Sequence, residues 1–192
     1  MKKFGISIAA IALVAFVGCN ENKKDAEKVM VEETVEVVKK MTPRTVSFIL
    51  ESKSESSAMG KAEFSQVNGM VRFDMKLRGL TPGVHAVHIH EKADCSSPDG
   101  KSAGGHWNPT MSKHGKWGDA EGYHKGDIGN LTADENGNGR ITLETDEWCI
   151  GCDDETKNVL GKGIIVHQGV DDYKTQPTGA AGGRVSCGGI IE

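Results

Sequence analysis

Residues 71–78 alternate strictly between apolar and charged side chains. The apolar positions are Val71, Phe73, Met75 and Leu77, and the charged positions are Arg72, Asp74, Lys76 and Arg78. A period of two predicts a β-strand that buries one face and exposes the other. Asn68 and Gly69, just before this run, both tolerate positive φ, so they predict a type I′ hairpin to the preceding strand.

From residue 45 onward, short runs rich in apolar and β-branched residues are separated by turn residues, a pattern typical of an all-β domain. We predict eight strands, at residues 45–51, 60–66, 70–77, 84–91, 127–131, 140–144, 163–167 and 185–190. Two connections, 92–126 and 168–184, are longer than such a domain needs. Connections of that length are usually functional or disordered.

The predicted strand at 84–91 carries three histidines, which its parity divides between two faces. His88 and His90 lie two positions apart, so their rings project side by side from one face. His85 lies on the opposite face among apolar residues, where a buried histidine hydrogen-bonded to backbone is more common than a metal ligand. We therefore expect His85 in the core and the other two at a functional site.

Three more histidines and an aspartate follow in and just after the first long connection. His106, His114, His124 and Asp127 offer three imidazoles and a carboxylate, a closed tetrahedral donor set of the kind that zinc prefers. His88, His90 and His167, all at strand ends, remain for a second site, where nitrogen donors favour copper. The inventory predicts two metal sites, and the alternative is a set of unrelated surface histidines.

The N-terminus has the features of an export signal. Two lysines precede an apolar run at 4–17 that is too short for a membrane span. Phe16-Val17-Gly18-Cys19 resembles the lipobox of bacterial lipoproteins, which predicts a signal peptide at 1–18, lipidation of Cys19 and a charged tether at 19–43. The alternative is an ordinary signal with a chance cysteine. We expect a lipid-anchored protein of the bacterial cell envelope, at the outer membrane or in the periplasm.

Export has consequences for charge and for the cysteines. Loss of the two signal-peptide lysines changes the formal net charge from −4 to −6, so nothing in the mature chain attracts nucleic acid. Cysteines pair in the oxidising surroundings of an exported protein. Cys149 and Cys152 therefore predict a tight disulfide, with a redox role or an accessory metal site as alternatives.

Six motifs resemble, in order and spacing, those of copper/zinc superoxide dismutase, across about residues 45–191. They are His88-Ile89-His90-Glu91, Gly105-His106-Trp107-Asn108-Pro109, Lys113-His114-Gly115, His124-Lys125-Gly126-Asp127-Ile128-Gly129-Asn130, Val166-His167 and Gly183-Arg184-Val185-Ser186-Cys187-Gly188. The resemblance implies an eight-stranded antiparallel Greek-key β-sandwich or flattened barrel at 44–192. It also implies dismutation of superoxide to O₂ and hydrogen peroxide. The cysteine pair at 149 and 152 is not part of the family pattern.

The resemblance further implies how the site is built, with one copper and one zinc ion per subunit. Copper would be bound by His88, His90, His106 and His167, and zinc by His106, His114, His124 and Asp127, so that the His106 imidazolate bridges both. Asp171 would link a copper ligand to a zinc ligand through hydrogen bonds. Arg184 would hold the anion beside copper, and Cys95 would pair with Cys187.

The resemblance implies a homodimer, with a monomer as the alternative. It does not indicate which lysines, if any, attract the substrate. A different function for the same fold is a non-catalytic protein that binds or delivers copper. All ligand positions and Arg184 are present in this chain, which favours catalysis and a role in protecting the cell envelope from oxidative damage.

Overall fold

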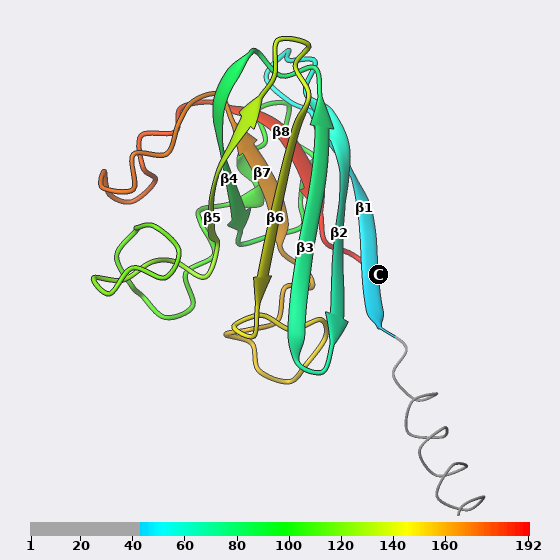
Figure 1. Cartoon of the computed structure of the whole chain (residues 1–192), viewed down its shortest axis with the longest axis vertical. Coiled ribbons are helices and arrows are strands. Elements are labelled where there is room, and N and C mark those ends of the chain that lie inside the picture. The colour runs from blue at the N-terminus through cyan, green and yellow to red at the C-terminus, as the bar shows by residue number, and fades with distance from the viewer. Residues whose placement is uncertain (1–42) are drawn as a thin grey trace, which may run out of the picture. The chain divides into compact units, whose positions relative to one another are not determined.

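The computed structural model describes residues 43–192, coloured in Figure 1. It contains eight strands and one short 3-10 helix: β1 (Arg44–Ser52), β2 (Met59–Val67), β3 (Met70–Arg78), β4 (Gly83–His90), η1 (Lys101–Ala103), β5 (Asp127–Ala133), β6 (Gly139–Thr145), β7 (Gly163–His167) and β8 (Arg184–Gly189). All eight strands predicted from the sequence are present, within two residues at each boundary. The predicted signal peptide, Cys19 and nearly all of the predicted tether lie outside the described residues.

The strands close into one barrel in the order β1-β2-β3-β6-β5-β4-β7-β8, and β1 completes it by pairing with β8. Every neighbouring pair is antiparallel. The chain passes from β3 to β4 across the ends of β6 and β5, which is a Greek-key connection. The predicted all-β architecture is therefore confirmed for residues 43–192.

The barrel interior is filled by the apolar face of each strand. On β3, the four apolar residues of the predicted alternation are at most 4% exposed, and Phe73 packs against Phe64 of β2 with ring centroids 4.7 Å apart. The turn between these strands is the predicted hairpin, in which Asn68 has φ 52° and Gly69 has φ 81°. The alternation in the sequence therefore set both the register and the buried face.

Two irregularities in strand pairing lie at the ends of β4 and β7. The β4–β5 register shifts between Val87 and His88, which brings His88 opposite Asp127. The β7–β8 register shifts between Val166 and His167, which brings His167 opposite Arg184. Such bulges redirect side chains. Here both lie where candidate site residues meet across neighbouring strands.

The two long connections project from the same side of the barrel, one light green and one orange in Figure 1. The first contains no strand, as predicted, and it contains η1, which the sequence did not predict. A disulfide between Cys95 and Cys187 ties it to β8, with the Cα atoms 5.8 Å apart. Closing this 92-residue separation stabilises the fold by about 4 to 5 kcal/mol in the chain-entropy model. Within residues 43–192, no helix is both long enough and apolar enough to cross a bilayer.

Candidate metal centre

Four histidine rings from three parts of the chain form the first cluster. His88 and His90 come from β4, His167 from the end of β7, and His106 from the first long connection. A β-bridge between His90 and His106 fixes that connection against β4. One ring nitrogen from each residue lies within 4.8 Å of the other three, and all four residues are buried.

One nitrogen of each strand histidine is held by an acceptor outside the cluster. Nε2 of His88 lies 2.8 Å from a carboxylate oxygen of Asp171, while Nδ1 of His90 lies 3.0 Å from the Gly104 carbonyl. Nδ1 of His167 lies 3.3 Å from the Gly182 carbonyl. Since an acceptor fixes the proton on the nitrogen that faces it, the other nitrogen of each ring keeps its lone pair.

Those other nitrogens are buried and have no hydrogen-bond partner among the described residues. They are Nδ1 of His88 and Nε2 of His90, His106 and His167. Buried polar atoms without a partner are rare, and several together point to an ion that they coordinate. The first cluster therefore presents a set of nitrogen donors suited to copper.

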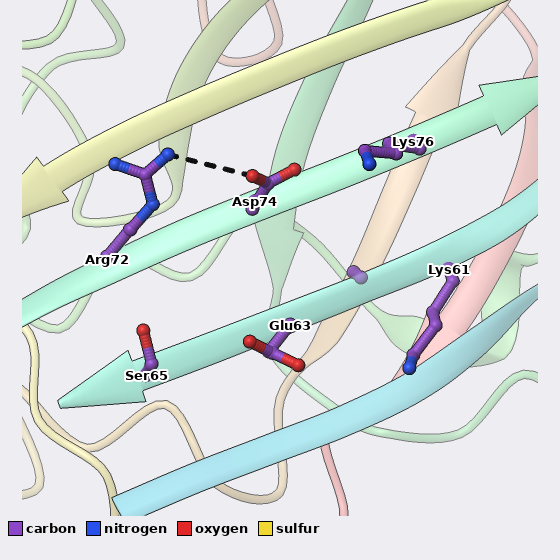
Figure 2. A pocket seen from close by; sticks show the side chains of 7 residues that line it. Lys61, Glu63, Ser65, Arg72, Asp74 and Lys76 are labelled. Atoms are coloured by element: carbon purple, nitrogen blue, oxygen red, sulfur yellow. Dashed lines mark ion pairs between the residues drawn. The ribbon is translucent and has the colours of Figure 1, made fainter. Parts of the chain in front are cut away.

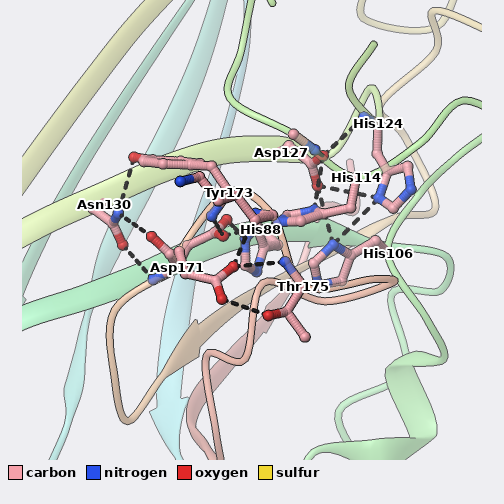
Figure 3. Close-up of polar contacts among 12 residues, drawn as sticks. His88, His106, His114, His124, Asp127, Asn130, Asp171, Tyr173 and Thr175 are labelled. Carbon is pink, nitrogen blue, oxygen red and sulfur yellow. Dashed lines mark hydrogen bonds and ion pairs between the residues drawn. The ribbon is translucent and has the colours of Figure 1, made fainter. Parts of the chain in front are cut away.

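The second cluster is built around the fully buried carboxylate of Asp127 (Figure 3). Nδ1 of His106 and Nδ1 of His114 each lie 3.0 Å from one of its oxygens, and Nδ1 of His124 lies 3.2 Å away. Neighbouring ligands of a tetrahedral zinc ion with bonds of 2.0 to 2.1 Å are roughly 3.3 Å apart. Three nitrogens and one oxygen at this spacing fit zinc.

His106 belongs to both clusters. Its Nδ1 is directed at Asp127, and its Nε2 is one of the buried nitrogens without a partner. Its ring centroid lies 3.9 Å from that of His88 and 5.5 Å from that of His124. A single imidazole can bridge two metal ions through its two nitrogens, and His106 lies where such a bridge would form.

Asp171 connects the clusters from the second long connection, as the family resemblance implied. Its oxygens lie 2.8 Å from Nε2 of His88 and 2.8 Å from Nε2 of His114. Asn130 holds the Asp171 backbone through two hydrogen bonds of 2.8 and 3.0 Å, and the Tyr173 hydroxyl lies 2.9 Å from the same amide (Figure 3). These contacts fix the ring orientations of both histidines.

Gln176 is a site residue that sequence reasoning missed. The His114 backbone N–H donates to Oε1 of Gln176, and Nε2 of Gln176 donates to the His114 carbonyl, both at 2.8 Å. Gly179 packs so closely that an added Cβ would lie 1.8 Å from Asp171 and 2.6 Å from His114. No local pattern signals these contacts, because Gln176 lies 62 residues from His114 in sequence.

Arg184 begins β8 and is half-buried beside the first cluster. Its guanidinium donates to the carbonyls of Gly100 at 2.8 Å and Gly104 at 2.7 Å. The Gly104 carbonyl also faces Nδ1 of His90, so Arg184 and that histidine share one acceptor. Burial lowers the pKa of Arg184, although Asp99 opposes this shift. The guanidinium stays charged, because an arginine pKa remains far above neutral pH.

Burial sets the protonation of the first cluster. Desolvation lowers the pKa of His106 to about 4, although Asp127 opposes this, and lowers that of His167 to about 3. The pKa of His90 is also lowered by burial. Neutral imidazoles are the form that binds metal, so this cluster is ready to coordinate at pH 7.

The second cluster combines anionic and cationic groups. Burial alone would raise the pKa of Asp127, but hydrogen bonds from His106, His114 and His124 hold it well below its usual value. Burial lowers the pKa of His114, but Asp127 and Asp171 on its two sides outweigh this and raise it to about 9. Metal binding at Nδ1 of His114 therefore has to displace a proton.

The remaining sequence-predicted residues occupy separate places. His85 is 2% exposed, and its ring nitrogens lie 2.8 Å from the carbonyls of His167 and Thr81, which confirms its assignment to the core. Cys149 and Cys152 form the second disulfide. Lys125 pairs with Glu147, so its charge is partly compensated.

A shallow pocket on the outer face of β2 and β3 contains only exposed or half-buried polar side chains and one alanine. Figure 2 shows Lys61, Glu63, Ser65, Arg72, Asp74 and Lys76 around it. Arg72 pairs with Asp74 and, at 2.5 Å, with Glu144 of β6. These strands carry none of the donor residues of the two clusters.

Residues 58–190 match the copper/zinc superoxide dismutase (SODC) family. The chain is 39% identical over 149 residues to copper-zinc superoxide dismutase 2 of Aquifex aeolicus, which covers 71% of this chain and 81% of the relative. It is also 39% identical over 124 residues to the copper-zinc superoxide dismutase of Caulobacter vibrioides, covering 62% and 71%.

A solved structure is similar in fold. The crystal structure of a double mutant of a superoxide dismutase-like protein from Bacillus subtilis superimposes with a TM-score of 0.68 at 30% sequence identity. The superposition covers 76% of this chain and 97% of that chain.

Proposed function

The chain belongs to the copper/zinc superoxide dismutase family, and we propose that its two donor clusters divide the metals between them. Copper is bound by His88, His90, His106 and His167, and zinc by His106, His114, His124 and Asp127. The protein converts superoxide to O₂ and hydrogen peroxide and uses copper and zinc as cofactors.

The observation that carries this assignment is the group of four buried ring nitrogens without hydrogen-bond partners among the described residues. Each of them belongs to a different proposed copper ligand, namely His88, His90, His106 or His167. Removing the ions would leave these lone pairs buried and unsatisfied, which costs free energy. The choice of metal follows from the donors, since imidazoles alone favour copper and an added carboxylate suits zinc.

His106 is the residue that we expect to move a proton. When bound, copper supplies the one-electron redox change of dismutation, and redox-inert zinc supplies fixed positive charge. Two superoxide anions and two protons give one O₂ and one hydrogen peroxide. Nε2 of His106 can hold one of these protons, because it is buried and has no hydrogen-bond partner among the described residues.

Arg184 is the residue that we expect to bind the substrate anion. Two carbonyls hold its guanidinium beside His90, and it stays charged although it is half-buried. A charge-assisted hydrogen bond from this group would orient superoxide. Since the whole chain carries net negative charge, attraction of an anion has to be local.

The direct test is to load the protein with copper and zinc, measure both metals, and measure superoxide dismutation by stopped-flow spectroscopy. We expect one copper and one zinc per chain and rapid dismutation. Full occupancy of both metals without dismutation would contradict the enzyme and favour the copper-binding or delivery protein instead.

We further propose that the protein is lipid-anchored through Cys19 in the bacterial cell envelope, where it protects the envelope from superoxide. The lipobox-like motif that ends at Cys19 supports this location. The test is metabolic labelling with a radioactive fatty acid, followed by fractionation of cells that express the chain or its Cys19→Ser variant. Label in the membrane-bound wild type and none in the variant is expected, while an unlabelled wild type would contradict the anchor.

A further inference from the structure

The connection between β6 and β7, residues 146–162, contains the cysteine pair that the family pattern does not explain. Its first residues lie against the segment Tyr123-His124-Lys125 of the first long connection. His124 is one of the proposed zinc ligands. The contacts between these two segments therefore bear on the proposed zinc site.

Glu147 and Trp148 contact both neighbours of His124. The Tyr123 hydroxyl donates to Oε1 of Glu147 at 2.5 Å, and Lys125 forms an ion pair with Oε2 of the same carboxylate. Nε1 of Trp148 donates to the Lys125 carbonyl at 2.9 Å. The residues on each side of His124 are thus held by the β6–β7 connection, Tyr123 through its side chain and Lys125 through its side chain and its carbonyl.

His124 needs such support more than the other histidines of the centre. The rings of His88, His90, His114 and His167 each have one nitrogen against an outer acceptor, and His106 has a donor cluster on each side. Among residues 43–192, the ring of His124 has no outer acceptor. Its orientation therefore depends on the residues that flank it in the chain.

Aromatic packing joins the same segments to the barrel. Trp148 is 1% exposed and packs edge-on against Phe64, with centroids 5.7 Å apart, and against Trp117 at 5.0 Å. Trp117 in turn packs on Tyr123 at 5.0 Å. Aromatic pairs at this spacing stabilise by more than their buried area alone, so Trp148 fixes the loop against the core.

The disulfide between Cys149 and Cys152 fixes the residues that follow Trp148. The Cys149 N–H donates to the Lys157 carbonyl at 2.8 Å, and the Ile150 N–H donates to the Gln66 side chain at 2.8 Å. Nη1 of Arg44 donates to the Gly151 carbonyl at 3.2 Å. The cross-linked turn is therefore attached to the beginning of β1 and the end of β2.

We propose that Glu147 and Trp148 are positioning residues for His124, that the Cys149–Cys152 disulfide holds them in place, and that together they slow the release of zinc. The proposal rests on the zinc assignment made under the proposed function. It gives the second disulfide a role in metal retention.

The test measures zinc release from the copper- and zinc-loaded full-length chain in the presence of an excess of a colorimetric chelator. Glu147→Ala should accelerate release by about tenfold, the lower end of the range for outer contacts at metal sites, because Glu147 acts on His124 through its two neighbours. Glu144→Ala is the matched control. Glu144 lies three residues before Glu147, and its removal breaks only an exposed ion pair with Arg72. Release from Glu144→Ala should equal that of the wild type.

A second readout separates positioning from general destabilisation. With Co²⁺ in the zinc position, the visible d–d absorption reports ligand geometry, and it should change in Glu147→Ala but not in Glu144→Ala. Glu147→Gln retains an acceptor for the Tyr123 hydroxyl and should partly restore both the spectrum and the release rate. The Cys149→Ser/Cys152→Ser variant should release zinc faster than the wild type.

The proposal would be overturned if Glu147→Ala and Glu144→Ala released zinc at the same rate and had the same Co²⁺ spectrum. This comparison holds whether or not the cysteine variant folds. Failure of the proposed function would look different. It would show as an absence of zinc or of dismutation in the wild type itself.

Discussion

The two donor clusters are built in different ways, although they share His106. In the proposed copper cluster, three of the four donor histidines lie on β4 and β7, where antiparallel pairing fixes them. In the zinc cluster, three ligands lie in an irregular connection and Asp127 opens β5. The barrel therefore preforms the first cluster, whereas the second depends on contacts from other connections and on the metal itself. Removal of single residues should expose this difference.

The largest effect should come from Asp127→Asn. The carboxylate faces three histidines and also accepts backbone N–H groups from Gly115 and His124, so loss of its charge removes the centre of the zinc cluster. Zinc affinity should fall by more than about 100-fold, beyond the range for an outer contact. Competition titration with a chelator measures it. Copper affinity should change far less, and equal loss of both metals would mean that the clusters are not built independently.

Arg184→Ile should be next in size and should affect rate without affecting metal content. The second-order rate constant with superoxide should fall by about tenfold or more, and its dependence on salt should flatten, because a local positive charge is lost. Stopped-flow measurements at several ionic strengths, with both metals quantified, provide the check. An unchanged rate constant would remove Arg184 from the mechanism.

Gln176→Ala should selectively weaken the zinc cluster. It removes the two hydrogen bonds to the His114 backbone, and zinc affinity should fall by about tenfold, with copper retained. Gln168→Ala, in the same connection, is the matched control, because no hydrogen bond from its side chain is present among the described residues. If the two variants bound zinc equally well, the Gln176 contact would have no part in holding the site.

The smallest effect concerns the pH dependence of the metal-free protein. Burial lowers the pKa of His106 to about 4 and that of His167 to about 3, against 6.5 for an ordinary histidine. Below about pH 6.5 the unfolded chain therefore takes up protons that the folded chain does not, and stability falls as pH falls toward 4. Calorimetry should show a lower Tm at pH 5 than at pH 7.

The variant His167→Gln sharpens that experiment, because it removes one of the titrating groups with a lowered pKa. Its Tm should fall less steeply between pH 7 and pH 5 than that of the wild type. The raised pKa of His114, about 9, acts in the opposite direction and only above about pH 6.5. A steeper decline in the variant would contradict the assignment of the effect to this cluster.

The strands could be predicted because alternation is a local signal. The face of His85 and the turn at Asn68-Gly69 followed from parity and turn chemistry, and both predictions are confirmed. The register shift beside His88 could not be foreseen, because it depends on how β4 meets β5 after the whole barrel closes. Pairing with a distant strand leaves no trace in a short window of sequence.

The candidate site divides in the same way. Its candidate metal-binding side chains were predicted from residue types and from family motifs, because the chemistry of coordination restricts which residues can serve. The residues that hold them were missed: Gln176 supports His114, and Glu147 and Trp148 contact the neighbours of His124. Amide, carboxylate and indole groups serve many purposes in proteins, so only the folded structure distinguishes these three.

The central claim is that the His106 imidazole joins two different metals. The most direct measurement is a crystal structure of the metal-loaded protein, with anomalous diffraction collected on both sides of the copper and zinc absorption edges. The account predicts a copper peak beside Nε2 of His106 and a zinc peak beside its Nδ1. Both metals on the same side of that ring, or no metal in contact with it, would contradict the account.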